Sequence, residues 1–132
     1  MARAEMLRMM KCLVIDESSI VAKVATRILA GIEIETSGAF SLEEASAQLG
    51  SEPLPALVIV SASLVGMPVE KAVKALRAMP GGAKAAILVS IVETNLGVMT
   101  RAKRAGSDGF IFRPFDRASL LAWIEPFVKV AA

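Results

Sequence analysis

Four short apolar runs and one run that alternates apolar and charged residues constrain the fold of this chain more than any other feature. A short, nearly continuous apolar run is typical of a strand that is covered on both faces. Each run is followed by a longer stretch with helical periodicity, and this alternation indicates a parallel sheet with helices on both faces. The predicted strands are residues 11–15, 32–35, 57–60, 86–90 and 109–112.

The second run, Ile32-Glu33-Ile34-Glu35, alternates as a half-exposed edge strand does. Right-handed crossovers leave few topologies for five parallel strands. The flavodoxin-like order 2-1-3-4-5 places the second strand at an edge. We therefore predict a flavodoxin-like, three-layer α/β/α sandwich with a five-stranded parallel sheet in this order and five helices.

Capping residues and helix breakers delimit the five predicted helices. Ser41 and Glu44 have the spacing of a capping box, and glycine at positions 31 and 106 stops two helices. In the first helix, one predicted face is apolar and the opposite face carries Lys23 and Arg27; the apolar residues are Ile20, Val21, Val24 and Ile28. The predicted helices are residues 19–30, 41–49, 68–79, 94–105 and 116–130.

Composition excludes several classes of protein. The net charge is +2 with no basic block, which argues against nucleic-acid binding. No apolar run has the length of a membrane helix, and residues 1–11 lack the features of a secretory signal. One cysteine and no histidine exclude a disulfide framework and a zinc site, and Cys12 is predicted to be a buried apolar residue. We expect a cytoplasmic protein with an N-terminal extension (1–10), one domain (11–130) and no output domain.

Polar residues follow four of the strands. In a sheet of this order, the carboxyl ends of strands one, three, four and five surround one crevice. The residues expected there are Asp16, Glu17, Ser61, Ser90 and Arg113.

These residues also carry a resemblance to a family. Residues 11–130 resemble the CheY-like receiver domain of two-component response regulators. The acidic pair Asp16-Glu17, the hydroxyl of Ser90, and Arg113-Pro114-Phe115 are similar to that family's acidic pair, Ser or Thr, and Lys-Pro-Phe. Its aromatic switch residue falls on Phe110, which we expect either to move or to pack in place. The resemblance implies phosphorelay signalling.

The departures from the family change the expected chemistry. Ser61 occupies the position of the aspartate that accepts a phosphoryl group, and a hydroxyl is a poor nucleophile without an adjacent base. Mg²⁺ prefers carboxylates, and Ser61 removes the third one from this pocket. No metal is therefore expected beyond weak binding at Asp16 and Glu17, and no cofactor is expected. Arg113 replaces a lysine; it can pair with Asp16 or Glu17, be exposed, or bind an anion. Ser90 is a switch hydroxyl or makes a capping or loop hydrogen bond.

The face that receivers use for contacts corresponds here to residues 94–128. Trp123 lies beside the apolar stripe of the last helix, where it can anchor an interface or cover its own domain. Arg101 and Arg104 belong to the densest basic cluster, which is either part of such an interface or a solvated helix face.

Together these features predict an atypical receiver, or pseudo-receiver, that is not an enzyme and acts by protein–protein interaction without aspartate phosphorylation. The expected partner is a histidine kinase, another regulator or the chain itself, with no nucleic acid and no membrane. The alternatives are a flavodoxin-like domain that binds a small ligand and a receiver that is phosphorylated at Ser61. A stable phosphorylated adduct would favour the last of these.

Overall fold

The computed structural model describes residues 10–128, which form a five-stranded parallel sheet in the order β2-β1-β3-β4-β5, as predicted. The strands are β1 (Lys11–Ile15), β2 (Glu35–Ala39), β3 (Leu57–Ser61), β4 (Ala86–Ile91) and β5 (Gly109–Phe112). The helices are α2 (Ser19–Ala30), α3 (Leu42–Leu49), α4 (Val69–Ala78), α5 (Leu96–Ala105) and α6 (Arg117–Val128). Residues 1–9 of the predicted extension and residues 129–130 of the predicted domain lie outside the described residues.

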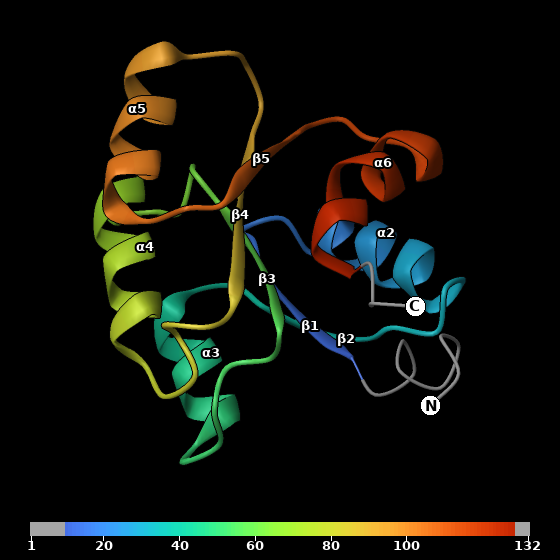
Figure 1. Ribbon diagram of the computed structural model, residues 1–132, viewed down its shortest axis with the longest axis horizontal. Coiled ribbons are helices and arrows are strands. Elements are labelled where there is room, and N and C mark those ends of the chain that lie inside the picture. Colours follow the sequence, from blue (N-terminus) through green and yellow to red (C-terminus); the bar gives the residue numbers. More distant parts are fainter. Residues whose placement is uncertain (1–9, 129–132) are drawn as a thin grey trace.

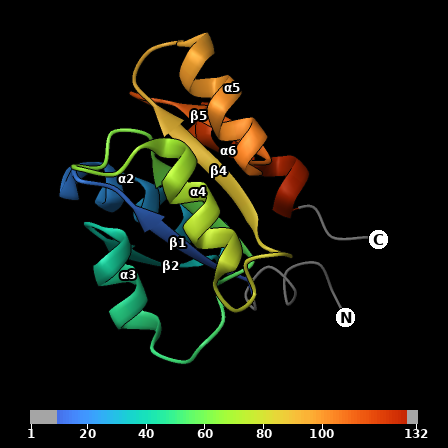
Figure 2. The same ribbon diagram turned by 90° about the vertical axis from the view of Figure 1, so that its left-hand side faces the viewer.

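The sheet separates two layers of helices. Helices α2 and α6 cover one face, and α3, α4 and α5 cover the other (Figure 1). Successive strand residues point to opposite faces, so each strand contributes to both cores. In β3, Val58 and Val60 pack toward α3, α4 and α5, whereas Leu57 and Ile59 pack toward α2 and α6. Figure 2 looks at the face that α3, α4 and α5 cover and shows α4 in front of the sheet, between α3 and α5. The predicted three-layer sandwich is thereby confirmed.

The second strand lies later in the chain than predicted: β2 is Glu35–Ala39 and not residues 32–35. Residues 32–34 instead belong to the turn that follows α2, and only Glu35 lies in the strand. Glu33 has a positive φ of 64°, and the Ile34 N–H donates to the Leu29 carbonyl over 3.0 Å. This is a Schellman motif, in which an apolar residue after the turn packs back on the helix. Ile34 is buried for that reason, and the alternation that resembled an edge strand belongs to a helix cap.

Helix α2 also orients differently from the prediction. Its buried residues are Ala25 and Leu29, whereas Ile20 and Val24, predicted to face the core, are 72% and 39% exposed. The helix approaches the sheet closely where two small residues meet. A Cβ placed on Gly38 would lie 3.4 Å from the Ala22 Cβ. Two large apolar side chains of the predicted stripe are consequently left on the surface.

The ends of α3, α5 and α6 are fixed by side-chain caps. The Ser41 hydroxyl accepts a hydrogen bond from the Glu44 N–H, as predicted. Helix α5 begins at Leu96, two residues later than predicted, because Asn95 provides its cap. Asp116 caps α6 as predicted, since its carboxylate accepts a bond of 2.8 Å from the Ser119 N–H.

Arg77, near the end of α4, connects three segments at the amino-terminal side of β4 and β5. Its guanidinium donates to the carbonyls of Gly82 and Ala85 over 2.8 and 2.7 Å and to the carbonyl of Gly106 over 3.0 Å. It also pairs with Asp108 at 2.8 Å, whose carboxylate accepts the N–H of Ile87 as well. One side chain thus ties α4, the loop before β4 and the loop before β5 together.

Two predictions from composition concern the described residues. No helix within residues 10–128 has the length and apolarity that crossing a membrane requires. Cys12 is a buried thiol in β1, as predicted, and packs in the core under α2 and α6.

Candidate functional site

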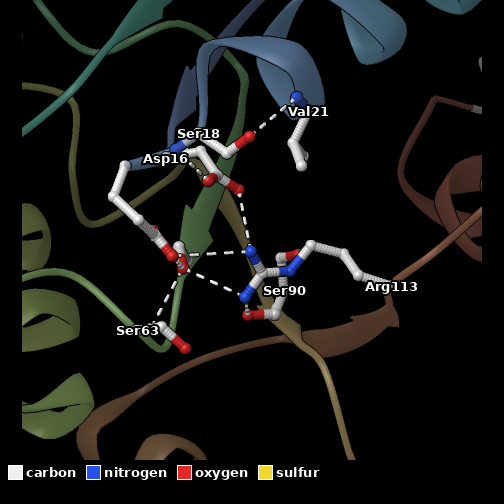
Figure 3. A network of polar contacts seen from close by, with 8 residues as sticks. Asp16, Ser18, Val21, Ser63, Ser90 and Arg113 are labelled. Atoms are coloured by element: carbon white, nitrogen blue, oxygen red, sulfur yellow. Dashed lines mark hydrogen bonds and ion pairs between the residues drawn. The ribbon is translucent and has the colours of Figure 1, made fainter.

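The turn from β1 into α2 holds the acidic pair at the carboxyl edge of the sheet. Asp16 is 2% exposed, and its carboxylate accepts a hydrogen bond of 2.8 Å from the Ser18 N–H. The Ser18 hydroxyl in turn accepts from the Val21 N–H over 3.3 Å and caps α2 (Figure 3). The same short turn therefore starts the helix and fixes the Asp16 carboxyl at the strand end.

Ser61 is the last residue of β3 and is fully enclosed. Its hydroxyl donates to Glu17 Oε1 over 3.0 Å. The hydroxyl oxygen accepts from the Ser63 N–H over 3.0 Å and from Arg113 Nη2 over 3.2 Å. All the hydrogen-bonding capacity of this hydroxyl is therefore used inside the protein.

Arg113 directly follows β5, and its backbone N–H extends the strand ladder by donating to the Ile91 carbonyl over 2.8 Å. This places the side chain over the crevice, where it is only 9% exposed. Nη1 lies 3.4 Å from Asp16 Oδ2 and 3.5 Å from Glu17 Oε1, and Nη2 lies 3.4 Å from the Ser90 carbonyl oxygen. The predicted ion pair is confirmed with both acids, and the alternative of an exposed Arg113 is wrong.

The two carboxyl groups differ in their electrostatic surroundings. Burial raises the pKa of Asp16, and this effect outweighs the hydrogen bond from Ser18 and the charge of Arg113, which lower it. Burial also acts to raise the pKa of Glu17, but the hydrogen bonds from its own N–H and from Ser61, together with Arg113, lower that pKa overall. Burial thus favours the proton on Asp16, whereas hydrogen bonding favours the charge on Glu17.

Three buried polar atoms in the crevice have no hydrogen-bond partner within residues 10–128: Glu17 Oε2, Ser90 Oγ and Arg113 Nε. Ser90 pairs in register with Ser61 but lies inside β4, which continues to Ile91. The predicted capping or loop hydrogen bond of Ser90 is therefore wrong, because the residue lies within the strand and its hydroxyl meets no loop backbone.

The donor set at this edge does not fit a magnesium ion. Mg²⁺ takes carboxylates and other hard oxygens and needs room for several waters. Here the two available carboxylates already face a guanidinium, and β3 ends in a hydroxyl. No group of three potential metal-ligating side chains occurs in the described part of the chain.

The remaining candidate residues lie outside this polar network. Phe110 packs against the core beneath α3, α4 and α5, as expected if it is fixed in place. The Trp123 ring meets the Phe112 ring edge to face at 5.7 Å between centroids, so Trp123 covers part of its own domain. Arg101 Nε lies 3.0 Å from Glu70 Oε2, and Arg104 is exposed on the same helix.

Sequence reasoning missed the backbone groups of the site. The N–H of Ser63 and the carbonyl of Ser90 both contact the network, but any residue type supplies these groups. The local turn after β3 brings the Ser63 N–H to the site, and the pairing of β3 with β4 brings the Ser90 carbonyl, so residue identity gave no signal for either group.

Comparison with known proteins gives a match of structure only. No family model matches the sequence, and no curated protein matches it. The fold matches solved response regulator receiver domains. The chemotaxis response regulator CheY4 of Vibrio cholerae is 24% identical with a TM-score of 0.81, over 90% of this chain and 98% of that one.

Two further structures share the fold. A response regulator from Thermotoga maritima is 19% identical with a TM-score of 0.78, over 89% of this chain and 96% of that one. A response regulator protein from Burkholderia pseudomallei, with a phosphorylated aspartic acid, a calcium ion and citrate, is 22% identical with a TM-score of 0.77, over 90% of this chain and 68% of that one. At these identities the likeness establishes the architecture.

Proposed function

We propose that this chain is an atypical receiver protein of two-component signalling, and that it acts by protein–protein contact without aspartate phosphorylation. The observation that carries the proposal is the contact set of Arg113: its guanidinium reaches Asp16, Glu17 and Ser61 at once. The space in which an incoming anion and a metal would meet the acidic pair is filled by the chain's own cation.

The chemistry of Ser61 supports the same proposal. A hydroxyl becomes a nucleophile when an adjacent base removes its proton. Glu17 does accept that proton in a hydrogen bond, but a carboxylate whose pKa is lowered is a weak base. The Ser61 oxygen also accepts two hydrogen bonds, which reduces its nucleophilicity. Phosphorylation at Ser61 is the less supported alternative, and we propose no enzymatic activity for the chain.

The expected setting follows from this role. A protein that receives no phosphoryl group delivers its signal through shape and surface. Its partner would be a histidine kinase, another regulator or a second copy of itself, and its place the cytoplasm, where two-component receivers act.

The test is incubation with acetyl phosphate and Mg²⁺ followed by intact-mass measurement. The native chain should gain no phosphoryl group. The variant Ser61→Asp combined with Arg113→Lys, which provides a carboxylate at the end of β3 and a more compact cation, should gain one. Ser61→Asp alone separates the two causes, since a silent single variant beside a reactive double variant assigns the block to Arg113.

A stable phosphoryl adduct on native Ser61 would overturn the proposal and establish the alternative of serine phosphorylation. Failure of the double variant would contradict the assignment of the block to Ser61 and Arg113. Ser46→Asp, on the exposed side of α3, is the matched control for an added carboxylate and should remain unmodified.

A further inference from the structure

A groove of about 540 Å³ runs over the free edge of the sheet, between α2, β2 and the start of α3. It lies beside the polar crevice and shares only Asp16 with it. Its floor consists of small apolar residues from α2 and β2: Ala22, Ala30, Gly38 and Ala39. A floor without large side chains leaves room for an inserted apolar group.

Three large apolar side chains on α2 and directly after β2 face solvent. Phe40 lines the groove and is 56% exposed, while Ile20 and Val24 stand on the outer side of α2. Within residues 10–128 these three are half of the large hydrophobic residues that are exposed. A concentration of exposed apolar surface beside a hollow marks an interaction site.

The two walls of the groove carry opposite charges. Lys23 and Arg27 line the α2 wall, and Glu44 lines the α3 wall with Glu43 next to it. No ion pair joins Lys23 or Arg27 to an acid in the described part of the chain. A surface with basic and acidic sides can complement itself when it is turned through a two-fold rotation.

We propose that a second copy of this chain docks in the groove and forms a two-fold symmetric dimer. Phe40 of each copy would enter the small-residue floor of the other, and Lys23 and Arg27 of each would face Glu44 of the other. This inference rests on the proposed function in one respect, because it names the second copy as one of the protein partners proposed there.

The charge pattern favours this occupant over a small anionic ligand. An anion that paired with Lys23 and Arg27 would also lie near Glu44 and Asp16 in the same groove. A second copy avoids that repulsion, because it presents an acidic wall to the basic wall and a basic wall to the acidic one.

Sedimentation equilibrium of the native chain is the direct test and should show a reversible monomer–dimer equilibrium. Phe40→Ala should raise the dimer dissociation constant about tenfold, as expected for an aromatic anchor at an interface centre. Lys74→Glu on α4, an exposed position that does not line the groove, is the matched control and should leave the constant unchanged.

Charge exchange provides a second, sharper test. The double variant Lys23→Glu with Arg27→Glu, and separately Glu44→Lys, should each be monomeric, because like charges then face each other. An equimolar mixture of the two should form a heterodimer, since both contacts are again between opposite charges. Unfolding midpoints of the variants establish that each is folded.

A native chain that stays monomeric at all concentrations, or a dimer that is indifferent to Phe40→Ala, would overturn the inference. So would a mixture of the charge variants that fails to associate. These outcomes are independent of the phosphorylation test: a monomer that also gains no phosphoryl group removes the dimer and leaves the proposed function in place.

Discussion

The guanidinium of Arg113 donates a hydrogen bond of 3.2 Å to the hydroxyl of Ser61, although β4 lies between the strands that carry these two residues. The arginine side chain therefore spans one whole strand at the carboxyl edge of the sheet. A shorter side chain at the end of β5 could not keep Asp16, Glu17 and Ser61 in contact together. The contact makes the length of Arg113, as well as its charge, part of the site.

Removal of the arginine should destabilise the protein. Arg113→Ala leaves Asp16 buried without its cation, and breaking a buried pair by removing one partner costs about 3 kcal/mol. Urea unfolding should show this loss in the free energy of unfolding. Arg101→Ala, which breaks the exposed pair with Glu70, is the control and should cost less than about 1 kcal/mol.

The same variant should respond to magnesium. With the guanidinium gone, Asp16 and Glu17 face a space that a divalent cation can enter. Millimolar Mg²⁺ should therefore raise the unfolding midpoint of Arg113→Ala and leave that of the native chain unchanged. Equal shifts in both proteins would contradict the proposal that Arg113 takes the place of a metal.

Asp16→Asn should gain stability relative to the native chain as pH rises. The pKa of Asp16 is raised by burial in the folded state, so its contribution to stability is fully present below its ordinary value of 3.8 and is lost as pH rises through the folded value. Asparagine does not ionise and keeps an oxygen for the Ser18 N–H. Urea unfolding at several pH values measures the difference between the two proteins.

Asp116 supplies a control of opposite sign. The hydrogen bond from the Ser119 N–H lowers the pKa of Asp116, so its contribution is present above the ordinary value and is lost as pH falls through the folded value. Asp116→Asn should lose stability relative to the native chain as pH rises. Curves of the same direction for both variants would mean that Arg113, and not burial, dominates at Asp16.

Arg77→Lys should destabilise the protein by about 2 kcal/mol. Lysine lacks the planar fork that reaches the carbonyls of Gly82, Ala85 and Gly106 together, so buried acceptors lose their donor. Thermal or urea unfolding measures the loss. Arg104→Lys on the exposed side of α5 makes the same chemical change without such contacts and should have little effect.

Cys12 should be unreactive in the folded protein. It is 1% exposed in β1, and burial raises the pKa of its thiol. A reagent therefore cannot reach the sulfur, and the reactive thiolate form is disfavoured. A thiol reagent should modify the native chain very slowly and the urea-unfolded chain at once. Rapid modification under native conditions would mean that β1 opens readily.

The sequence was sufficient for the strand order and for the position of the polar crevice, because both follow from alternation and from where parallel strands end. It failed where one pattern has two structural causes. Ile32 and Ile34 alternate with acids as an edge strand does, yet they flank Glu33, the positive-φ residue in the turn that follows α2. Nothing in the residue types signals that Glu33 adopts this conformation, since glycine is the usual choice there.

The exposure of Ile20 and Val24 could not be predicted from the sequence, for a different reason. Helical spacing identifies an apolar stripe but does not say which part of it meets the sheet. In the structure, α2 lies against β2 at Ala22 and Gly38 and buries Ala25 and Leu29, so Ile20 and Val24 are left toward solvent. In the polar site, spacing predicted which residues would meet, whereas the unpartnered hydroxyl of Ser90 depends on the length of β4.

A counter-ion that is part of the polypeptide has a consequence for how such a protein would be controlled. Its charge cannot diffuse away or be competed out, so the state of the crevice would not follow the supply of magnesium or of phosphoryl donors in the cell. On the proposed function, the amount of signal would then be set by how many copies are made and destroyed.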